Sequence, residues 1–178
     1  MSTLEVKELS APSGFDLKIA TGKTLDLKSQ GTVTMPTGST LQMVSTGTIA
    51  RTTITSTGSW TNTGNTLSIT PSSASSKILV TVTQPVRIAG SSNLMRGGFR
   101  LNRGSSTIWN TDNFVEHIHV RNADNEHDSV ITALHLDSPA TTSAVTYTLQ
   151  AWNHDANNGL YIWESTKGSS MILTEVSG

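Results

Sequence analysis

Apolar and polar side chains alternate along most of this chain. In residues 78–83, Ile78, Val80 and Val82 lie two apart, and Thr81 and Thr83 occupy the opposite face. A period of two predicts a β-strand with one face toward a core, and no segment keeps the helical period of roughly 3.6 over a dozen residues. The same alternation recurs in residues 99–109, 114–120, 130–136, 145–151 and 169–176, so we expect seven to nine strands.

The alternation also predicts which side chains share the face toward the core. That set comprises Phe99, Leu101, Phe114, Ile118, Val120, Val130, Leu134, Leu136, Val145, Tyr147, Leu149 and Ala151. After residues 145–153, Asn158-Gly159 is typical of a hairpin turn, because both residues tolerate positive φ. Strands at regular spacing with turns between them predict an all-β fold, an antiparallel β-sandwich or jelly roll. A parallel α/β fold is not expected, because no crossover helices are visible.

Charge divides the chain into two parts. Residues 1–28 carry eight charged side chains, whereas residues 29–76 carry only Arg51. We therefore predict an N-terminal β segment at residues 1–40 and a jelly-roll head at residues 41–178.

The N-terminal segment raises a packing problem. Residues 13–38 form short apolar runs separated by glycine, and an isolated hairpin is only marginally stable in water. The apolar side chains of this segment must pack either on their own domain or on identical copies of the chain. We expect a three-fold shaft, because closed cyclic assembly is common. The predicted shaft residues are Phe15, Leu17, Ile19, Leu25, Leu27, Val33 and Met35.

Composition excludes several classes of protein. The 178 residues include no cysteine, so no disulfide framework or thiolate metal site is possible. The formal net charge is −1, which argues against nucleic-acid binding, and no apolar run is long enough for a membrane-spanning helix. The first residues lack a signal-peptide pattern, so we expect no ordinary secretion.

Serine and threonine make up about 29% of the chain, which predicts strands with a hydroxyl-covered surface.

The chain resembles small fibre proteins of marine tailed phages, cyanophages especially. The glycine-punctuated start is followed by a Pro-x-Gly-x-x-x-Gln junction at Pro36, Gly38 and Gln42. The resemblance implies a short trimeric shaft and a trimeric β-sandwich head, broadly like tumour-necrosis-factor or C1q folds. The segments that resemble such heads are residues 67–82, 99–109, 137–152 and 171–178.

Aromatic and amide side chains suggest a glycan site. Trp109 precedes several polar residues in an apparent loop, whereas we expect Trp152 and Trp163 to pack in the core or between subunits. The candidate receptor contacts are Trp109, Asn110, Asp112, Asn113, Asn122 and Asp124.

Several other motifs are only weak candidates for a metal, phosphate, calcium or catalytic site. His117 and His119 share a strand face and are weak candidates for a metal site. A metal there requires either a third ligand, such as His127, Asp124 or His135, or a position on a three-fold axis. The Gly22-Lys23-Thr24 sequence lacks the remainder of a phosphate-binding loop, and residues 121–129 lack the spacing of a calcium loop. Paired carboxylates such as Asp112 with Glu116 are not placed across a predicted cleft. We therefore predict no enzymatic activity and no cofactor.

These observations predict a homotrimeric, non-enzymatic protein of the virion surface. In one hypothesis the head binds a host-surface glycan or protein, and the other end contacts the particle. In the alternative hypothesis the protein decorates the capsid at three-fold or quasi-three-fold sites. The expected partners are copies of itself and other capsid or tail proteins, without nucleic acid or membrane insertion.

Overall fold

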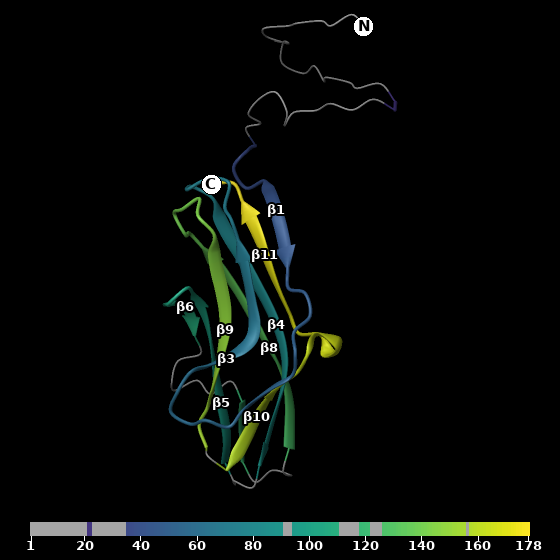
Figure 1. Cartoon of the computed structure of the whole chain (residues 1–178), viewed down its shortest axis with the longest axis vertical. Helices are drawn as coiled ribbons and strands as arrows, with labels where there is room; N and C mark the ends of the chain where they lie inside the picture. The colour runs from purple at the N-terminus through teal and green to yellow at the C-terminus, as the bar shows by residue number, and fades with distance from the viewer. Residues whose placement is uncertain (1–20, 23–34, 91–93, 111–117, 122–125, 156) are drawn as a thin grey trace, which may run out of the picture. The chain divides into compact units, whose positions relative to one another are not determined.

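The structure is a computed structural model, and it describes residues 21–22, 35–90, 94–110, 118–121, 126–155 and 157–178. The chain divides into two compact units, residues 1–34 and 35–178. The described residues of the second unit form eleven β-strands and one short 3-10 helix (Figure 1). They are β1 (Thr40–Ser45), β2 (Thr52–Ile54), β3 (Thr61–Ile69), β4 (Lys77–Gly90), β5 (Leu94–Arg103), β6 (Ser106–Asn110), β7 (Ile118–Arg121), β8 (Glu126–Asp137), β9 (Val145–Asn153), β10 (Asn158–Ile162), η1 (Ser165–Lys167) and β11 (Ser170–Val176).

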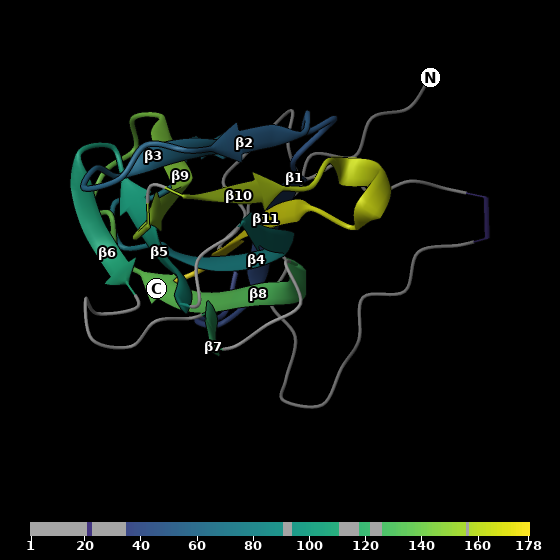
Figure 2. The same ribbon diagram turned by 90° about the horizontal axis from the view of Figure 1, so that it is seen from below.

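The strands form two antiparallel sheets. Sheet A has the order β1-β11-β4-β10-β2, with β8 on the other side of β4. Sheet B has the order β3-β9-β5-β6, and β7 also pairs with β5. Seen from below, β3, β9, β5 and β6 lie on one side and β10, β4 and β8 on the other (Figure 2). The predicted all-β antiparallel sandwich is confirmed.

The core lies between the two sheets, as the alternation predicted for most strands. Ile78, Val80 and Val82 of β4 are fully buried. From sheet B, Phe99 and Leu101 of β5 and all four apolar residues predicted for β9 are buried with them. A turn joins β5 and β6, where Gly104 has a φ of 55°.

Strand β4 changes partner near its middle. Its first half pairs with β11 as far as Thr83, and its second half pairs with β10 from Val86 onward. Pro85 lies at this change, where its carbonyl accepts the Trp163 amide. Because proline has no amide hydrogen, it belongs where no ladder donor is needed. The buried Gln84 side chain donates to the carbonyls of Pro85 and Trp163 and so connects the two halves.

The predicted turn at Asn158-Gly159 is wrong. Both residues belong to β10, and Gly159 is not among the glycines with positive φ. Strand β9 lies in sheet B and β10 in sheet A, so the two form no hairpin. Asn158 pairs instead with Gly90, where an added Cβ would lie 2.5 Å from a backbone oxygen. This close approach replaces the turn that the dipeptide usually makes.

The predicted inward face of β8 is also wrong. Val130, Leu134 and Leu136 are exposed, whereas Ile131 and Ala133 on the opposite face are buried. The inward face also carries the buried carboxylate of Asp137. Arg103 Nη1 lies 2.8 Å from its Oδ1, and the Tyr147 hydroxyl donates to its Oδ2 at 2.7 Å. Because these sheet B groups satisfy the carboxylate, Asp137 can lie on the inward face of β8.

The start of the second unit is tied to the end of the described chain. Gly38 and Ser39 exchange backbone hydrogen bonds with Ser177, and β1 pairs with β11. Met35, a predicted shaft residue, is exposed. The other predicted shaft residues lie outside the described residues: Phe15, Leu17, Ile19, Leu25, Leu27 and Val33.

Candidate functional site

The outer face of sheet A exposes a continuous set of apolar side chains. Strand register places Leu136 beside Leu79, and Leu134 beside Thr81, which in turn neighbours Ile172. The four most exposed members have between 53% and 67% of their surface accessible. We call this set the apolar face; it comprises Met43, Leu79, Val130, Leu134, Leu136 and Ile172.

Charged side chains lie only at the two ends of this surface, among the described residues of β1, β4, β8 and β11. Lys77 lies at one end, and Arg87, Glu126 and Asp128 lie at the other. The central positions between them are apolar or carry hydroxyl groups. Contiguous apolar surface of this kind on a soluble protein marks a contact with another molecule.

Strand β8 adds a second feature to the same surface. Within the described part of the chain it pairs only with β4, along residues 126–137. Its other edge therefore presents unpaired backbone groups, which natural proteins usually cover or block. The apolar face and this open edge together point to association at sheet A.

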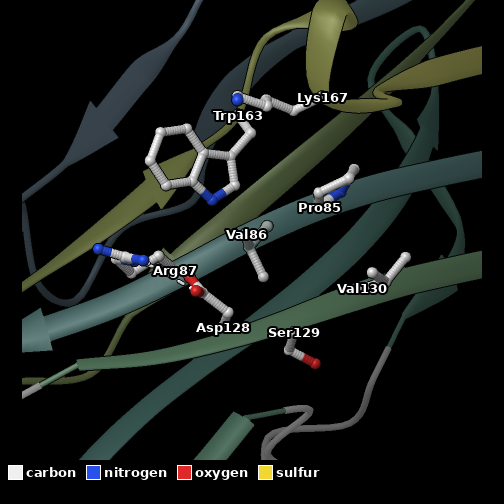
Figure 3. Close-up of a pocket in the computed structure, with 8 residues that line it drawn as sticks. All are labelled: Pro85, Val86, Arg87, Asp128, Ser129, Val130, Trp163 and Lys167. Atoms are coloured by element: carbon white, nitrogen blue, oxygen red, sulfur yellow. Dashed lines mark hydrogen bonds and ion pairs between the residues drawn. The ribbon is translucent and has the colours of Figure 1, made fainter.

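A groove lies at the charged end of the apolar face (Figure 3). It has a volume of about 450 Å³, within the usual range for small-molecule sites. Strands β4 and β8 form its floor, and the segment between β10 and β11 forms its upper wall. The lining residues are Pro85, Val86, Arg87, Asp128, Ser129, Val130, Trp163 and Lys167.

The charged groups of the groove are engaged with one another. Arg87 Nε and Nη2 donate to Asp128 at 2.7 and 2.8 Å, and Nη1 donates to Glu126 at 2.5 Å. The hydrogen bond with Asp128 raises the pKa of Arg87, and the same bond lowers the pKa of Asp128. Both groups are charged at neutral pH, so this pair is not suited to proton transfer.

Two guanidinium groups fix the Trp163 side chain at the groove. Arg51 Cζ lies 4.6 Å from the centre of the indole ring, and Arg87 Cζ lies 5.5 Å from it. Arg51 also lies 5.2 Å from the Tyr161 ring. The indole is thereby held as a rigid wall of the groove by cation–π contacts.

The outer face of sheet B is polar by contrast. Cross-strand hydroxyl groups pair between β3 and β9, at 2.9 Å for Thr66 with Thr148 and 2.7 Å for Ser68 with Thr146. At the other end of this face, the Trp60 and Trp152 ring centres lie 6.3 Å apart. Arg100 Cζ lies 4.7 Å from the Trp60 ring. This face therefore combines paired hydroxyls with an aromatic and cationic cluster.

The structure does not gather the predicted receptor contacts into one site. Trp109 lies in β6, not in a loop, and packs half-buried against the core, while Asn110 is exposed. Trp152 and Trp163, predicted for the core or a subunit contact, are half-buried on the outer faces of sheets B and A. Outside the described residues lie Asp112, Asn113, Asn122, Asp124 and His117, together with the His119 side chain.

Trp60 was not predicted from the sequence as a member of this aromatic cluster, because its contact depends on the strand register. Trp60 directly precedes β3, and its contact with Trp152 depends on the pairing of β3 with β9. The alternation of β9 did hold a signal for Trp152, because an even position is out of phase with Val145 and Tyr147. That phase predicts an outward side chain.

Two features are absent from the part of the chain that the structure describes. In that part of the chain, no three histidine, aspartate or glutamate side chains are grouped so that they could hold a metal ion. No helix there is long and apolar enough to cross a membrane.

Comparison with models of known protein families gave no match, and comparison with curated proteins gave none either. The second unit is an antiparallel β-sandwich with one apolar and one polar outer face.

Proposed function

We propose that this protein is a non-enzymatic, homotrimeric virion protein of a bacteriophage, a fibre or spike whose β-sandwich head binds the host surface. The observation that carries the proposal is the apolar face of sheet A. A surface with exposed Val130, Leu134 and Leu136 and no central charge is costly to leave in water. Packing it against another copy removes that cost.

Association with identical copies is the simplest way to cover this face. Its centre is uncharged, so two copies can approach without like-charge repulsion. Closed cyclic assembly then limits the number of copies. The resemblance of the sequence to trimeric phage fibres supports three copies and the virion setting.

A structural role for Gln42 adds support to that resemblance. Gln42 is the last residue of the Pro-x-Gly-x-x-x-Gln junction, and its amide donates to Glu175 at 2.6 Å and to the Thr70 carbonyl at 2.7 Å. The junction glutamine therefore joins β1 to β11 and to the end of β3. A motif that fastens the start of a head domain is what a shaft-to-head junction requires.

The oligomeric state tests the proposal directly. We expect the full chain to sediment at about 57 kDa, three times its mass of 18.9 kDa. Two charges in the apolar face, L134E/L136E, should give a monomer that keeps its β-sheet circular dichroism. The matched control T146E places a charge on the exposed outer face of sheet B and should remain trimeric. A wild-type chain at 18.9 kDa, or an L134E/L136E variant that stays assembled, contradicts the proposal.

The adhesive role needs a second test. We expect the purified trimer to bind host cells and to reduce adsorption of particles that contain the protein. A few trimers per particle, located at the tail, agree with a fibre. Hundreds of chains on the head shell and no inhibition of adsorption would instead identify capsid decoration.

A further inference from the structure

Arg100 of sheet B differs from two other arginines, Arg87 of sheet A and Arg103 of sheet B, in its partners. Arg87 and Arg103 each contact a carboxylate, at 2.7 Å for Asp128 and 2.8 Å for Asp137. Arg100 forms no ion pair with any described residue. Its partial burial lowers its pKa below the ordinary value, and no described acid offsets that effect.

The surroundings of Arg100 hold its guanidinium in one orientation. Arg100 Nε donates to Gln150 Oε1 at 2.7 Å, and Asn102 Nδ2 donates to the same oxygen at 3.1 Å. The Gln150 amide in turn donates to Asn62 Oδ1 at 2.6 Å. One face of the guanidinium lies over the Trp60 ring, with centres 4.7 Å apart.

Among the described residues, the Nε of Arg100 is hydrogen-bonded, but neither Nη1 nor Nη2 donates a hydrogen bond. The two terminal nitrogens of a guanidinium match the two oxygens of a carboxylate. Orientation by Gln150 and Trp60 before binding reduces the entropy lost when an anion binds.

A pair of aromatic side chains lies beside Arg100. Trp60 and Trp152 lie 6.3 Å apart at a tilt of 38°, and His154 contacts the edge of Trp152 at 5.0 Å. Small-ligand sites usually combine aromatic surface with a few placed polar groups. The amides of Asn62 and Gln150 border this surface.

We propose that the cluster of Trp60, Asn62, Arg100, Gln150 and Trp152 binds an anionic saccharide through a carboxylate of the sugar. The carboxylate pairs with the terminal nitrogens of Arg100, and the sugar ring packs on the tryptophan pair. Positive charge without a carboxylate partner among the described residues is the feature that favours an acidic ligand. The inference rests on the adhesive function proposed above and names the ligand class of its head.

Calorimetric titration of the full chain with tetragalacturonate tests this site. We expect saturable binding of that probe and at least tenfold weaker binding of neutral maltotetraose. Arg100→Gln should reduce affinity for tetragalacturonate at least tenfold. The matched control is Arg51→Gln, because Arg51 also stacks on tryptophan but lies away from this cluster; it should leave affinity unchanged. Trp152→Ala should weaken binding, and each variant must keep the thermal midpoint of a folded protein.

The outcomes separate the possible anions and the two proposals. Equal binding of a sulfated galactose tetrasaccharide extends the ligand class to sulfate, whereas binding of the sulfated probe alone overturns the carboxylate assignment. Absent binding of tetragalacturonate, or an unchanged affinity in Arg100→Gln, overturns the site. The L134E/L136E variant should bind the probe with wild-type affinity per chain. A wild-type chain that is monomeric but binds the probe therefore counts against the proposed trimer alone.

Discussion

The two outer faces of the sandwich differ in how their side chains are satisfied. On sheet B, the hydroxyls of Thr66 and Ser68 pair with those of Thr148 and Thr146. On sheet A, Leu134 is exposed and its cross-strand neighbour is Thr81. Sheet B therefore satisfies these hydroxyls within one chain, whereas sheet A leaves apolar area exposed among the described residues. Both faces are built from similar threonine-rich strands, so the difference comes from the few positions that carry leucine, valine and methionine.

The largest expected effect tests which side of β8 faces the core. In the L136E background, Ile131→Ala should lower the free energy of unfolding by about 2–5 kcal/mol, because it empties a fully buried site. Leu134→Ala in the same background should change it by less than about 0.5 kcal/mol. Urea unfolding measures both values. Equal losses would mean that β8 does not separate an inner from an outer face.

The next effect compares two carboxylates of β8. Asp137 lies between the sheets with a side chain that is 8% exposed, whereas Asp128 lies on the outer face at 60%. Asp137→Asn should cost about 1.5–3 kcal/mol, because Arg103 and Tyr147 both donate to the lost charge. Asp128→Asn should cost no more than about 1 kcal/mol, since exposed ion pairs contribute little. A similar loss in both variants would remove the distinction between the inner and the outer position.

A smaller effect depends on pH at the joint of β1 and β11. Burial raises the pKa of Glu175, but hydrogen bonds from Gln42 and from the loop of residues 72–76 outweigh it, so the pKa lies below the ordinary 4.5. A lowered folded pKa adds stability above the unfolded pKa, and that stability is lost as the pH falls through the folded value. Glu175→Gln should therefore cost about 1–2 kcal/mol at pH 7 and progressively less below pH 4.5. Unfolding curves across pH 2–7, with the exposed Glu126→Gln as control, test this; a pH-independent loss contradicts it.

The smallest effect tests the completed surface of sheet B. Thr146→Ala removes one member of a cross-strand hydroxyl pair and should cost about 0.2–1 kcal/mol. Thr132→Ala, at an exposed position of sheet A without a hydroxyl partner among the described residues, should cost less. Thermal unfolding of both variants in the L134E/L136E background gives the comparison. A larger loss at Thr132 would reverse the contrast between the faces.

Strand β4 shows what sequence alternation predicts well, and β8 shows where it fails. In β4, Ile78, Val80 and Val82 are apolar on the buried face, so the period of two leaves little ambiguity. In β8 both faces carry apolar side chains: Ile131 and Ala133 point inward, and Val130, Leu134 and Leu136 point outward. The inner face of β8 includes Asp137, whose partner Arg103 lies 34 residues earlier and in the other sheet. Alternation alone cannot reveal a partner supplied by the second layer.

The aromatic cluster on sheet B shows the same limit for sites. Trp60, Arg100 and Trp152 are far apart in sequence and come together only through the order β3-β9-β5. The predicted candidates around Trp109 are adjacent in the chain. Adjacency in a strand sends successive side chains to opposite faces, so a site built across strands draws on residues that a local motif does not contain.

The change of partner at Pro85 has a consequence for the internal motion of sheet A. Hydrogen-bonded ladders on that side of β4 stop on either side of residues 84 and 85, and β8 alone continues across the boundary. Such a seam divides a sheet into units that open independently. We expect the amide hydrogens of β10 and those of β11 to exchange with solvent as two separate groups. The side-chain amide of Gln84 connects the two halves of the sheet, so its loss should let the half that contains β10 open first.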